Sequence, residues 1–192
     1  MKWIAPMFYK IKYILIRFYR ILNVKKRSEF VWKDLIEYNL DKGWRFGQFE
    51  TEKRIENKFN VDGSILIKFD YIVTYNDLEY SSIILESFEE DKTSDIMILA
   101  SHINSLLNFG VVKVSVKHNY VEYTFSRDLV TYMLYPLEIE NDHFDHYNFT
   151  KDCVWSFNRL METGEDPVFV FSELLQRKEE KEKADNSSNL IE

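Results

Sequence analysis

The fold is decided by the stretch Thr93–Tyr135, which reads TSDIMILASHINSLLNFGVVKVSVKHNYVEYTFSRDLVTYMLY. Its first part, Thr93–Phe109, repeats apolar residues at helical spacing and predicts a helix with one apolar face. The apolar residues on that face are Ile96, Leu99, Ile103, Leu106 and Leu107. We expect Thr93 or Ser94 to cap this helix and Gly110 to end it in the left-handed conformation.

The second part of the stretch alternates between apolar and polar residues, which predicts a β-hairpin. The candidate turn is His118-Asn119. A two-residue loop there pairs the apolar residues across the strands as Val116 with Val121, Val114 with Tyr123 and Val112 with Phe125. All six side chains then share one face, and we expect Val114, Val116, Val121, Tyr123 and Phe125 to be buried against Leu99, Ile103 and Leu106.

Three antiparallel strands are predicted before this helix, with a further segment, Trp44–Phe49, as the opening of the sheet. The three strands run about Arg54–Val61, Ile65–Tyr75 and Leu78–Phe88, with turns at Asp62-Gly63 and Asn76-Asp77. A helix of about Glu29–Asp41 precedes the strands and ends at Gly43. Its core candidates are Phe30, Leu35, Ile36 and Leu40.

After the hairpin, Leu129–Tyr135 is rich in β-formers and is expected to extend the sheet. The polar segment Glu138–Asn148 is predicted to be a loop, and Thr150 is expected to cap a helix that ends at Glu162. Asp166 and Pro167 predict the start of a last helix, Val168–Lys178.

The fold class is therefore α+β: an antiparallel sheet (three strands, a helix, a strand hairpin) covered by helices, with an extra N-terminal amphipathic helix. Three regions are predicted: a basic amphipathic helix and hinge at 1–27, the α+β domain at 28–178, and a disordered charged tail at 179–192.

The composition fits a packed domain. The chain has 192 residues, of which 45% are hydrophobic and 16% aromatic, with only 5 Gly and 3 Pro. It has one cysteine, Cys153, so an internal disulfide is excluded and nothing indicates an oxidising compartment. We therefore expect a cytoplasmic protein.

The net charge of −7 is unevenly distributed along the chain. Residues 1–27 contain eight Lys or Arg and no acidic residue, so the other 17 basic residues accompany all 32 acidic ones. An acidic body argues against nucleic-acid binding, because phosphate contacts require basic patches.

The N-terminal segment sorts into two faces when it is placed on a helix that starts at Pro6. Its apolar arc includes Phe8, Ile11, Leu15, Phe18 and Leu22, and the opposite face carries Lys10, Lys12, Arg17 and Arg20. The charges interrupt every apolar run, so the segment resembles neither a signal peptide nor a transmembrane span. Two interpretations stay open: the arc covers the protein's own core, or it contacts a membrane, a partner or a second copy. We predict the second.

The order of elements resembles the YbjN family, whose domain is similar to the type III secretion chaperone fold. The residues that carry the likeness are Asp34–Trp44, Asn104–Gly110, the hairpin Val111–Phe125 and the aromatic segment Cys153–Phe157. The match covers about residues 29–162. The resemblance implies a protein-binding or regulatory module without a catalytic centre.

Candidate metal ligands cluster in Asp142-His143-Phe144-Asp145-His146. The two histidines are three residues apart and share a face only if the segment is helical, and zinc sites need three or four ligands. We expect a solvated acidic loop, no metal and no cofactor. Cys153 lacks a catalytic partner signature, and no phosphate loop or nucleophile elbow is present, so no catalytic residue is predicted.

The leading functional prediction is a non-enzymatic, protein-binding or chaperone-like adaptor that binds another protein or a second copy of itself. The alternative is a peripheral membrane protein, anchored by residues 1–22 on an anionic surface at the inner membrane face. A metal-dependent enzyme that uses Asp142–His146 ranks last.

Overall fold

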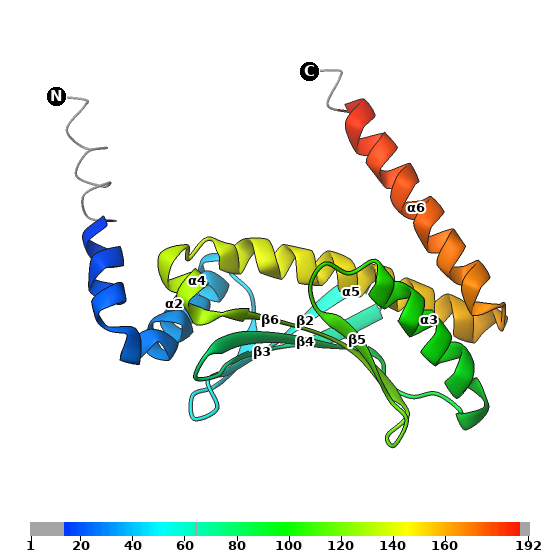
Figure 1. The fold of residues 1–192 in the computed structure, drawn as a ribbon, viewed down its shortest axis with the longest axis horizontal. Helices are drawn as coiled ribbons and strands as arrows, with labels where there is room; N and C mark the ends of the chain where they lie inside the picture. The colour runs from blue at the N-terminus through cyan, green and yellow to red at the C-terminus, as the bar shows by residue number, and fades with distance from the viewer. Residues whose placement is uncertain (1–13, 64, 189–192) are drawn as a thin grey trace. The chain divides into compact units, whose positions relative to one another are not determined.

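The computed structural model describes residues 14–63 and 65–188 as a mixture of helices and a six-stranded sheet (Figure 1). The strands are β1 (Phe46–Phe49), β2 (Arg54–Asp62), β3 (Ile65–Val73), β4 (Asp77–Leu85), β5 (Val111–Ser115) and β6 (Tyr120–Asp128). The helices are residues 14–22, α2 (Arg27–Asp41), α3 (Thr93–Ser105), α4 (Leu129–Leu134), α5 (Glu138–Thr163) and α6 (Pro167–Ser188), with short 3-10 turns η1 (Val24–Lys26) and η2 (Glu90–Lys92). The predicted α+β fold class is confirmed.

The sheet has the strand order β1-β2-β3-β4-β6-β5, so β1 and β5 are its edges. The alternation of the sequence becomes an alternation of burial along β3 and β4, as expected for strands with one covered face. The buried side chains of these two strands are Ile67, Phe69, Tyr71, Val73, Leu78, Tyr80, Ser82 and Ile84. The strand predicted to follow the Asp62-Gly63 turn is therefore confirmed.

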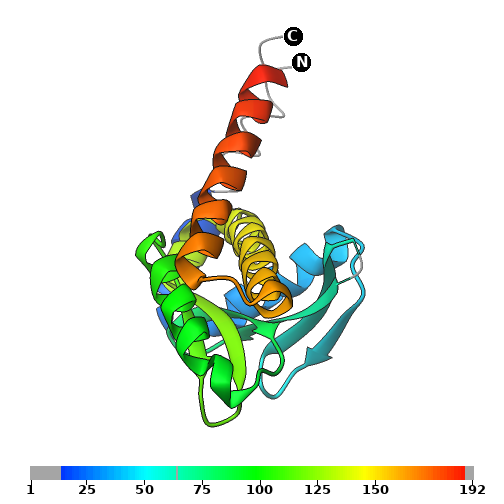
Figure 2. The same cartoon turned by 90° about the vertical axis from the view of Figure 1, so that its right-hand side faces the viewer.

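The chain divides into two compact units, each assembled from three segments. Unit 1 consists of the described residues of Met1–Lys58, Lys68–Tyr80 and Ser126–His146, and within it α2 packs on α4. Unit 2 consists of the described residues of Phe59–Ile67, Ser81–Phe125 and Tyr147–Glu192. Within unit 2, α3 packs on β5 and on the start of the long helix α6 (Figure 2). The predicted region boundaries at 27 and 178 stay a prediction.

Helix α3 starts where the sequence predicts but ends at Ser105, before Phe109. No side chain caps its start; the N-cap is Lys92, at the end of η2. The end of the helix is fixed by Asn104, whose side-chain amide accepts from the Val112 N–H at 2.7 Å and donates to the Val112 carbonyl at 2.9 Å. Gly110 has φ +77°, and a Cβ there would lie 2.7 Å from the Thr124 carbonyl oxygen, so only glycine fits.

The hairpin β5–β6 forms, but its predicted register is wrong by two residues. Val112 pairs with Tyr123 and Val114 with Val121, which leaves residues 116–119 as a four-residue loop. A two-residue loop of the expected kind needs positive φ at both central positions, and only Asn119 adopts it, with φ +52°. A shift of two residues preserves the faces, so Val121, Tyr123 and Phe125 are buried as predicted, and Val112 is buried with them. Val116 is 52% exposed, Leu106 is also exposed and Val114 is half-buried, so these three expectations were wrong.

Leu129–Tyr135 does not extend the sheet. Residues Leu129–Leu134 form α4, and the Asp128 carboxylate caps this helix by accepting from the Val130 N–H at 2.6 Å. Leu129, Tyr132 and Met133 are buried, and their spacing is helical. Tertiary packing and the cap therefore override the β-propensity of this stretch.

The predicted loop Glu138–Asn148 is the first part of α5. Thr150 caps no helix, since it lies inside α5, fully buried, with its hydroxyl 2.8 Å from the Ser82 hydroxyl. The buried residues of α5 follow helical spacing throughout, but in its first half several of them are polar. They are Ile139, Asp142, His143, His146, Thr150, Cys153, Val154, Ser156, Phe157 and Leu160.

Helix α6 starts as predicted, with the Asp166 carboxylate accepting from the Val168 N–H at 2.8 Å, but it continues to Ser188. Lys178, at the end of the predicted helix, and Lys181, in the predicted tail, both pair with Asp152 of α5, at 3.4 and 3.0 Å. The expectation of disorder from residue 179 therefore differs from the structure up to Ser188.

On α2, the core candidate Leu35 is buried, whereas Leu40 is exposed and Phe30 and Ile36 are half-buried.

Two valines of the β5–β6 hairpin give a matched test of the register. Val121→Asp should lower the free energy of unfolding by about 3 to 5 kcal/mol, because it buries an uncompensated charge. Val116→Asp, in the exposed loop, should change it by no more than about 0.5 kcal/mol. Urea denaturation of both variants measures the difference, and equal losses would show that the observed register is wrong.

Candidate functional site

The predicted contact surface lies on the helix of residues 14–22, which we call the N-terminal helix; it is the blue helix before α2 in Figure 1. Leu15, Phe18 and Leu22, which we call the apolar strip, are spaced along one side of it and are 62%, 62% and 81% exposed. The other predicted contact residues, Phe8, Lys10, Ile11 and Lys12, lie outside the described residues.

The two described arginines of this helix contact the body of unit 1. Arg20 donates two hydrogen bonds to the two carboxylate oxygens of Asp34 on α2, each 2.6 Å long. This ion pair is largely shielded from solvent, with the two side chains 15% and 12% exposed. The guanidinium of Arg20 also lies 5.5 Å from the ring centre of Phe30, and that of Arg17 lies 4.8 Å from the ring of Tyr135. The basic side of the helix thus meets the body, while the apolar strip faces away from these contacts.

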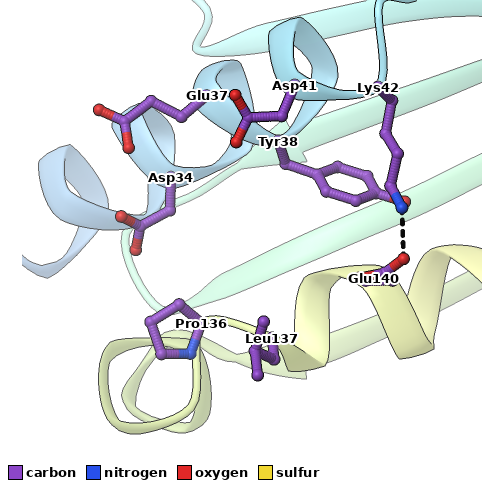
Figure 3. Close-up of a pocket in the computed structure, with 8 residues that line it drawn as sticks. All are labelled: Asp34, Glu37, Tyr38, Asp41, Lys42, Pro136, Leu137 and Glu140. Carbon is purple, nitrogen blue, oxygen red and sulfur yellow. Dashed lines mark hydrogen bonds and ion pairs between the residues drawn. The ribbon is translucent and has the colours of Figure 1, made fainter. Parts of the chain in front are cut away.

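A hollow of about 330 Å³ lies beside Asp34, between α2 and the start of α5 (Figure 3). Its lining residues are Asp34, Glu37, Tyr38, Asp41, Lys42, Pro136, Leu137 and Glu140. Lys42 and Glu140 form an ion pair from one wall to the other. Burial, and then the charge of Glu140, raises the pKa of Tyr38, so its hydroxyl stays neutral. With four carboxylates and one ammonium, the hollow is acidic.

Buried polar side chains on the first turns of α5 form a hydrogen-bonded network with the strands and α4. The Tyr71 hydroxyl lies 2.7 Å from His143 Nδ1. Tyr132 donates to the Asp142 carboxylate at 2.5 Å, and Arg127 donates to its other oxygen at 2.6 Å. Burial raises the pKa of Asp142 despite these donors, because desolvation of the carboxylate is the larger effect.

The two histidines of this part of α5, His143 and His146, are held neutral by burial. Desolvation lowers the pKa of His143 from 6.5 to about 4 and that of His146 from 6.5 to about 3. His146 packs against aromatic rings, with its ring centre 5.3 Å from that of Phe69 and 5.7 Å from that of Tyr80. Asp142, His143 and His146 are at most 7% exposed, so the prediction of a solvated loop was wrong.

Sequence reasoning missed this network because its members are polar residues at buried positions. The signal that could have found it is the helical spacing of Ile139, Asp142, His143 and His146 in continuation of Thr150 and Cys153. It also missed the acidic side of α2, although Asp34, Glu37 and Asp41 share one helix face at spacings of three and four.

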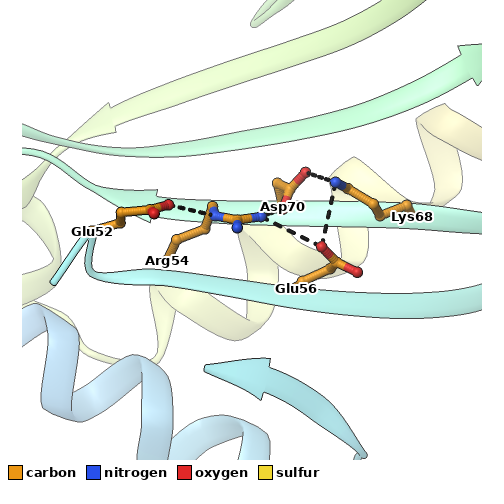
Figure 4. Close-up of polar contacts among 5 residues, drawn as sticks. All are labelled: Glu52, Arg54, Glu56, Lys68 and Asp70. Atoms are coloured by element: carbon orange, nitrogen blue, oxygen red, sulfur yellow. Dashed lines mark hydrogen bonds and ion pairs between the residues drawn. The ribbon is translucent and has the colours of Figure 1, made fainter. Parts of the chain in front are cut away.

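A third group of polar residues, with three carboxylates and two basic side chains, joins β2 to β3 (Figure 4). Arg54 contacts Glu52, Glu56 and Asp70 at 3.0, 3.4 and 3.0 Å, and Lys68 contacts Glu56 and Asp70 at 3.4 and 3.0 Å. The hydrogen bond to Asp70 raises the pKa values of both Arg54 and Lys68. Because each base already has carboxylate partners, this group is a cross-strand support for the sheet.

Cys153 is separate from these polar groups. Cys153 is buried in α5, and burial raises the pKa of its thiol well above the usual range, which leaves it unreactive.

The sequence matches no protein-family model and no curated protein. Among solved structures it matches the crystal structure of YbjN, described as "a putative transcription regulator from E. coli", a protein of the family that the element order resembles. The TM-score is 0.44 and the identity 14%, over 62% of this chain and 87% of that chain. Within the described part of the chain, none of the helices combines the length and the hydrophobicity needed to cross a membrane.

The buried histidines predict a steep loss of stability in acid. Each binds a proton in the unfolded chain below pH 6.5 but stays neutral in the fold until its lowered pKa is reached. The unfolded state therefore binds more protons as the pH falls, and stability should drop by up to about 1.4 kcal/mol per pH unit for each histidine between pH 6 and 4.

Urea denaturation between pH 7 and 4 measures this slope. His146→Leu should reduce the slope of stability against pH by the contribution of one histidine, whatever the variant does to stability at pH 7. His118→Leu, at an exposed position of the β5–β6 loop, should leave it unchanged. Identical slopes for all three proteins would contradict the neutral, buried state of His146.

We also predict that the purified protein contains no stoichiometric metal. Within residues 14–63 and 65–188, no three His, Cys, Asp or Glu side chains gather as a metal site, and the His143 Nδ1 faces the Tyr71 hydroxyl. Elemental analysis should find well below one zinc per chain. About one zinc per chain that disappears in the His143→Ala/His146→Ala variant would overturn this prediction.

Proposed function

We propose that the protein is a non-enzymatic binding module that recognises another protein through the apolar strip of its N-terminal helix. The observation that carries this proposal is the orientation of the helix. Arg20 and Arg17 contact Asp34, Phe30 and Tyr135, and the large apolar side chains at 15, 18 and 22 remain exposed.

Exposure of this strip has a cost in water that a partner would remove. Burying a Leu or Phe side chain contributes about 1.5 to 3 kcal/mol relative to leaving it exposed. Three such residues at helical spacing match the way in which an amphipathic helix fills an apolar groove on another protein. Neighbouring apolar side chains at Ile14 and Ile21 are also exposed and widen the surface.

A protein partner is favoured over an anionic membrane by the placement of Arg17 and Arg20, the two basic residues of the helix that the structure describes. Each Lys or Arg near an acidic lipid surface contributes about 1 kcal/mol of attraction. Arg20 is engaged by Asp34, and Arg17 stacks on Tyr135, so both are directed to the protein itself. The acidic hollow beside them would be repelled by the same lipids.

The test compares a strip variant, Leu15→Ser/Phe18→Ser/Leu22→Ser, with a control variant, Leu66→Ser/Phe109→Ser/Phe144→Ser, which removes equally exposed apolar residues elsewhere. Proteins that co-purify with the parent chain are identified, and each is expressed and titrated with the three purified chains by calorimetry. The strip variant should bind its partner at least about 100-fold more weakly, since about 3 kcal/mol or more is lost. The control should bind like the parent.

Two further measurements test the other possible occupants of the apolar strip, a second copy of the chain and a membrane. Sedimentation equilibrium of the parent and the strip variant tests whether a second copy covers the strip. Flotation with vesicles of phosphatidylserine and phosphatidylcholine tests the membrane. Attachment of the parent to vesicles, lost in the strip variant and without any protein partner, would replace the proposed function by peripheral membrane binding.

A further inference from the structure

The N-terminal helix is attached to unit 1 by charged and aromatic contacts. All of its described side chains, residues 14–22, are exposed or half-buried. These contacts include the Arg20–Asp34 ion pair, the stacking of Arg17 on Tyr135 and of Arg20 on Phe30, and an edge-to-face contact of Tyr19 with Phe30 at 5.9 Å. A helix that belongs to a core is attached by a buried apolar side instead.

The Arg20–Asp34 pair is the strongest of these contacts. It is bidentate, with two parallel hydrogen bonds of 2.6 Å, which is the geometry that gives an arginine–carboxylate pair both strength and direction. Asp34 stands on the acidic side of α2, together with Glu37 and Asp41, at the edge of the hollow. The basic side of one helix therefore meets the acidic side of the next, and the attraction is electrostatic.

The connection between the two helices allows the first to move. Asn23 ends the N-terminal helix, and the 3-10 turn η1, whose three residues are all exposed, separates it from α2. Short 3-10 stretches between helices are typical hinge positions. The sequence already indicated a hinge here from the run Lys25-Lys26-Arg27.

We propose that the N-terminal helix is a detachable arm, held against α2 by the Arg20–Asp34 ion pair and able to swing about η1. This inference rests on the proposed function, because the position of the arm sets the direction in which the apolar strip meets its partner. An attachment made by charges weakens with ionic strength, whereas one made by apolar burial does not. Salt, or a basic segment that competes for the acidic side of α2, would release the arm.

Hydrogen exchange of the full-length chain, followed by mass spectrometry of peptides, tests the inference. Asp34→Asn keeps the size of the side chain and removes the charge, and it should speed exchange of amides 14–22 at least tenfold, with little change in β3. Glu37→Gln, one turn away on the same side of α2, is the matched control and should leave exchange of 14–22 as in the parent. The charge exchange Arg20→Asp/Asp34→Arg should restore slow exchange.

Salt provides a second readout on the same peptides. One molar sodium chloride should speed exchange of 14–22 in the parent and add little in Asp34→Asn, because the pair is already absent there. Unchanged exchange in both Asp34→Asn and Arg20→Gln would overturn the inference. So would a loss of protection throughout unit 1, which would make the helix an integral part of the fold.

The outcomes separate this inference from the proposed function. If the strip variant loses its partner while Asp34→Asn exchanges like the parent, the function stands and the detachable arm does not. If Asp34→Asn releases the arm while the strip variant binds every partner normally, the arm stands and the function fails.

Discussion

The need to provide hydrogen-bond partners for buried polar side chains of α5 constrains much of this structure. In unit 1, Asp142 is held by Tyr132 of α4 and Arg127 of β6, and His143 is held by Tyr71 of β3. A buried carboxylate without partners would cost several kcal/mol. The position of α4, the end of β6 and the rotation of α5 about its axis are therefore fixed together, and none can change without leaving a buried group unsatisfied.

The same constraint explains which parts of the fold could be predicted from the sequence. Strands β3 and β4 and the β5–β6 hairpin present apolar residues at a period of two, so the sequence predicts all of these strands and, for the hairpin, also the buried face. The start of α5 also has buried residues at a regular spacing, here the spacing of a helix, but these buried residues are the polar Asp142, His143 and His146. Hydrophobicity cannot reveal a periodicity that polar residues carry, so that segment was interpreted as a loop.

The remaining errors arise where local chemistry has more than one solution. The hairpin register depended on whether His118-Asn119 forms a two-residue turn, and a loop of four residues preserves the same buried face with a different pairing. The stretch Leu129–Leu134 has β-forming residues and also an Asp cap with helical spacing, and contacts with α2 favour the helix. Such choices are made by packing between distant segments, which a single sequence does not display.

The orientation of the N-terminal helix is also not determined by its own sequence, and this orientation bears on the proposed function. Its sequence defines two faces, but which face meets the protein depends on the surface beside it. Asp34 on the acidic side of α2 pairs with Arg20, and Arg17 lies on the ring of Tyr135, so the usual arrangement of an amphipathic helix is reversed. Because the apolar strip gains nothing from that attachment, its exposure has no explanation in the stability of the chain, and a surface on another molecule is the simplest reason for keeping it.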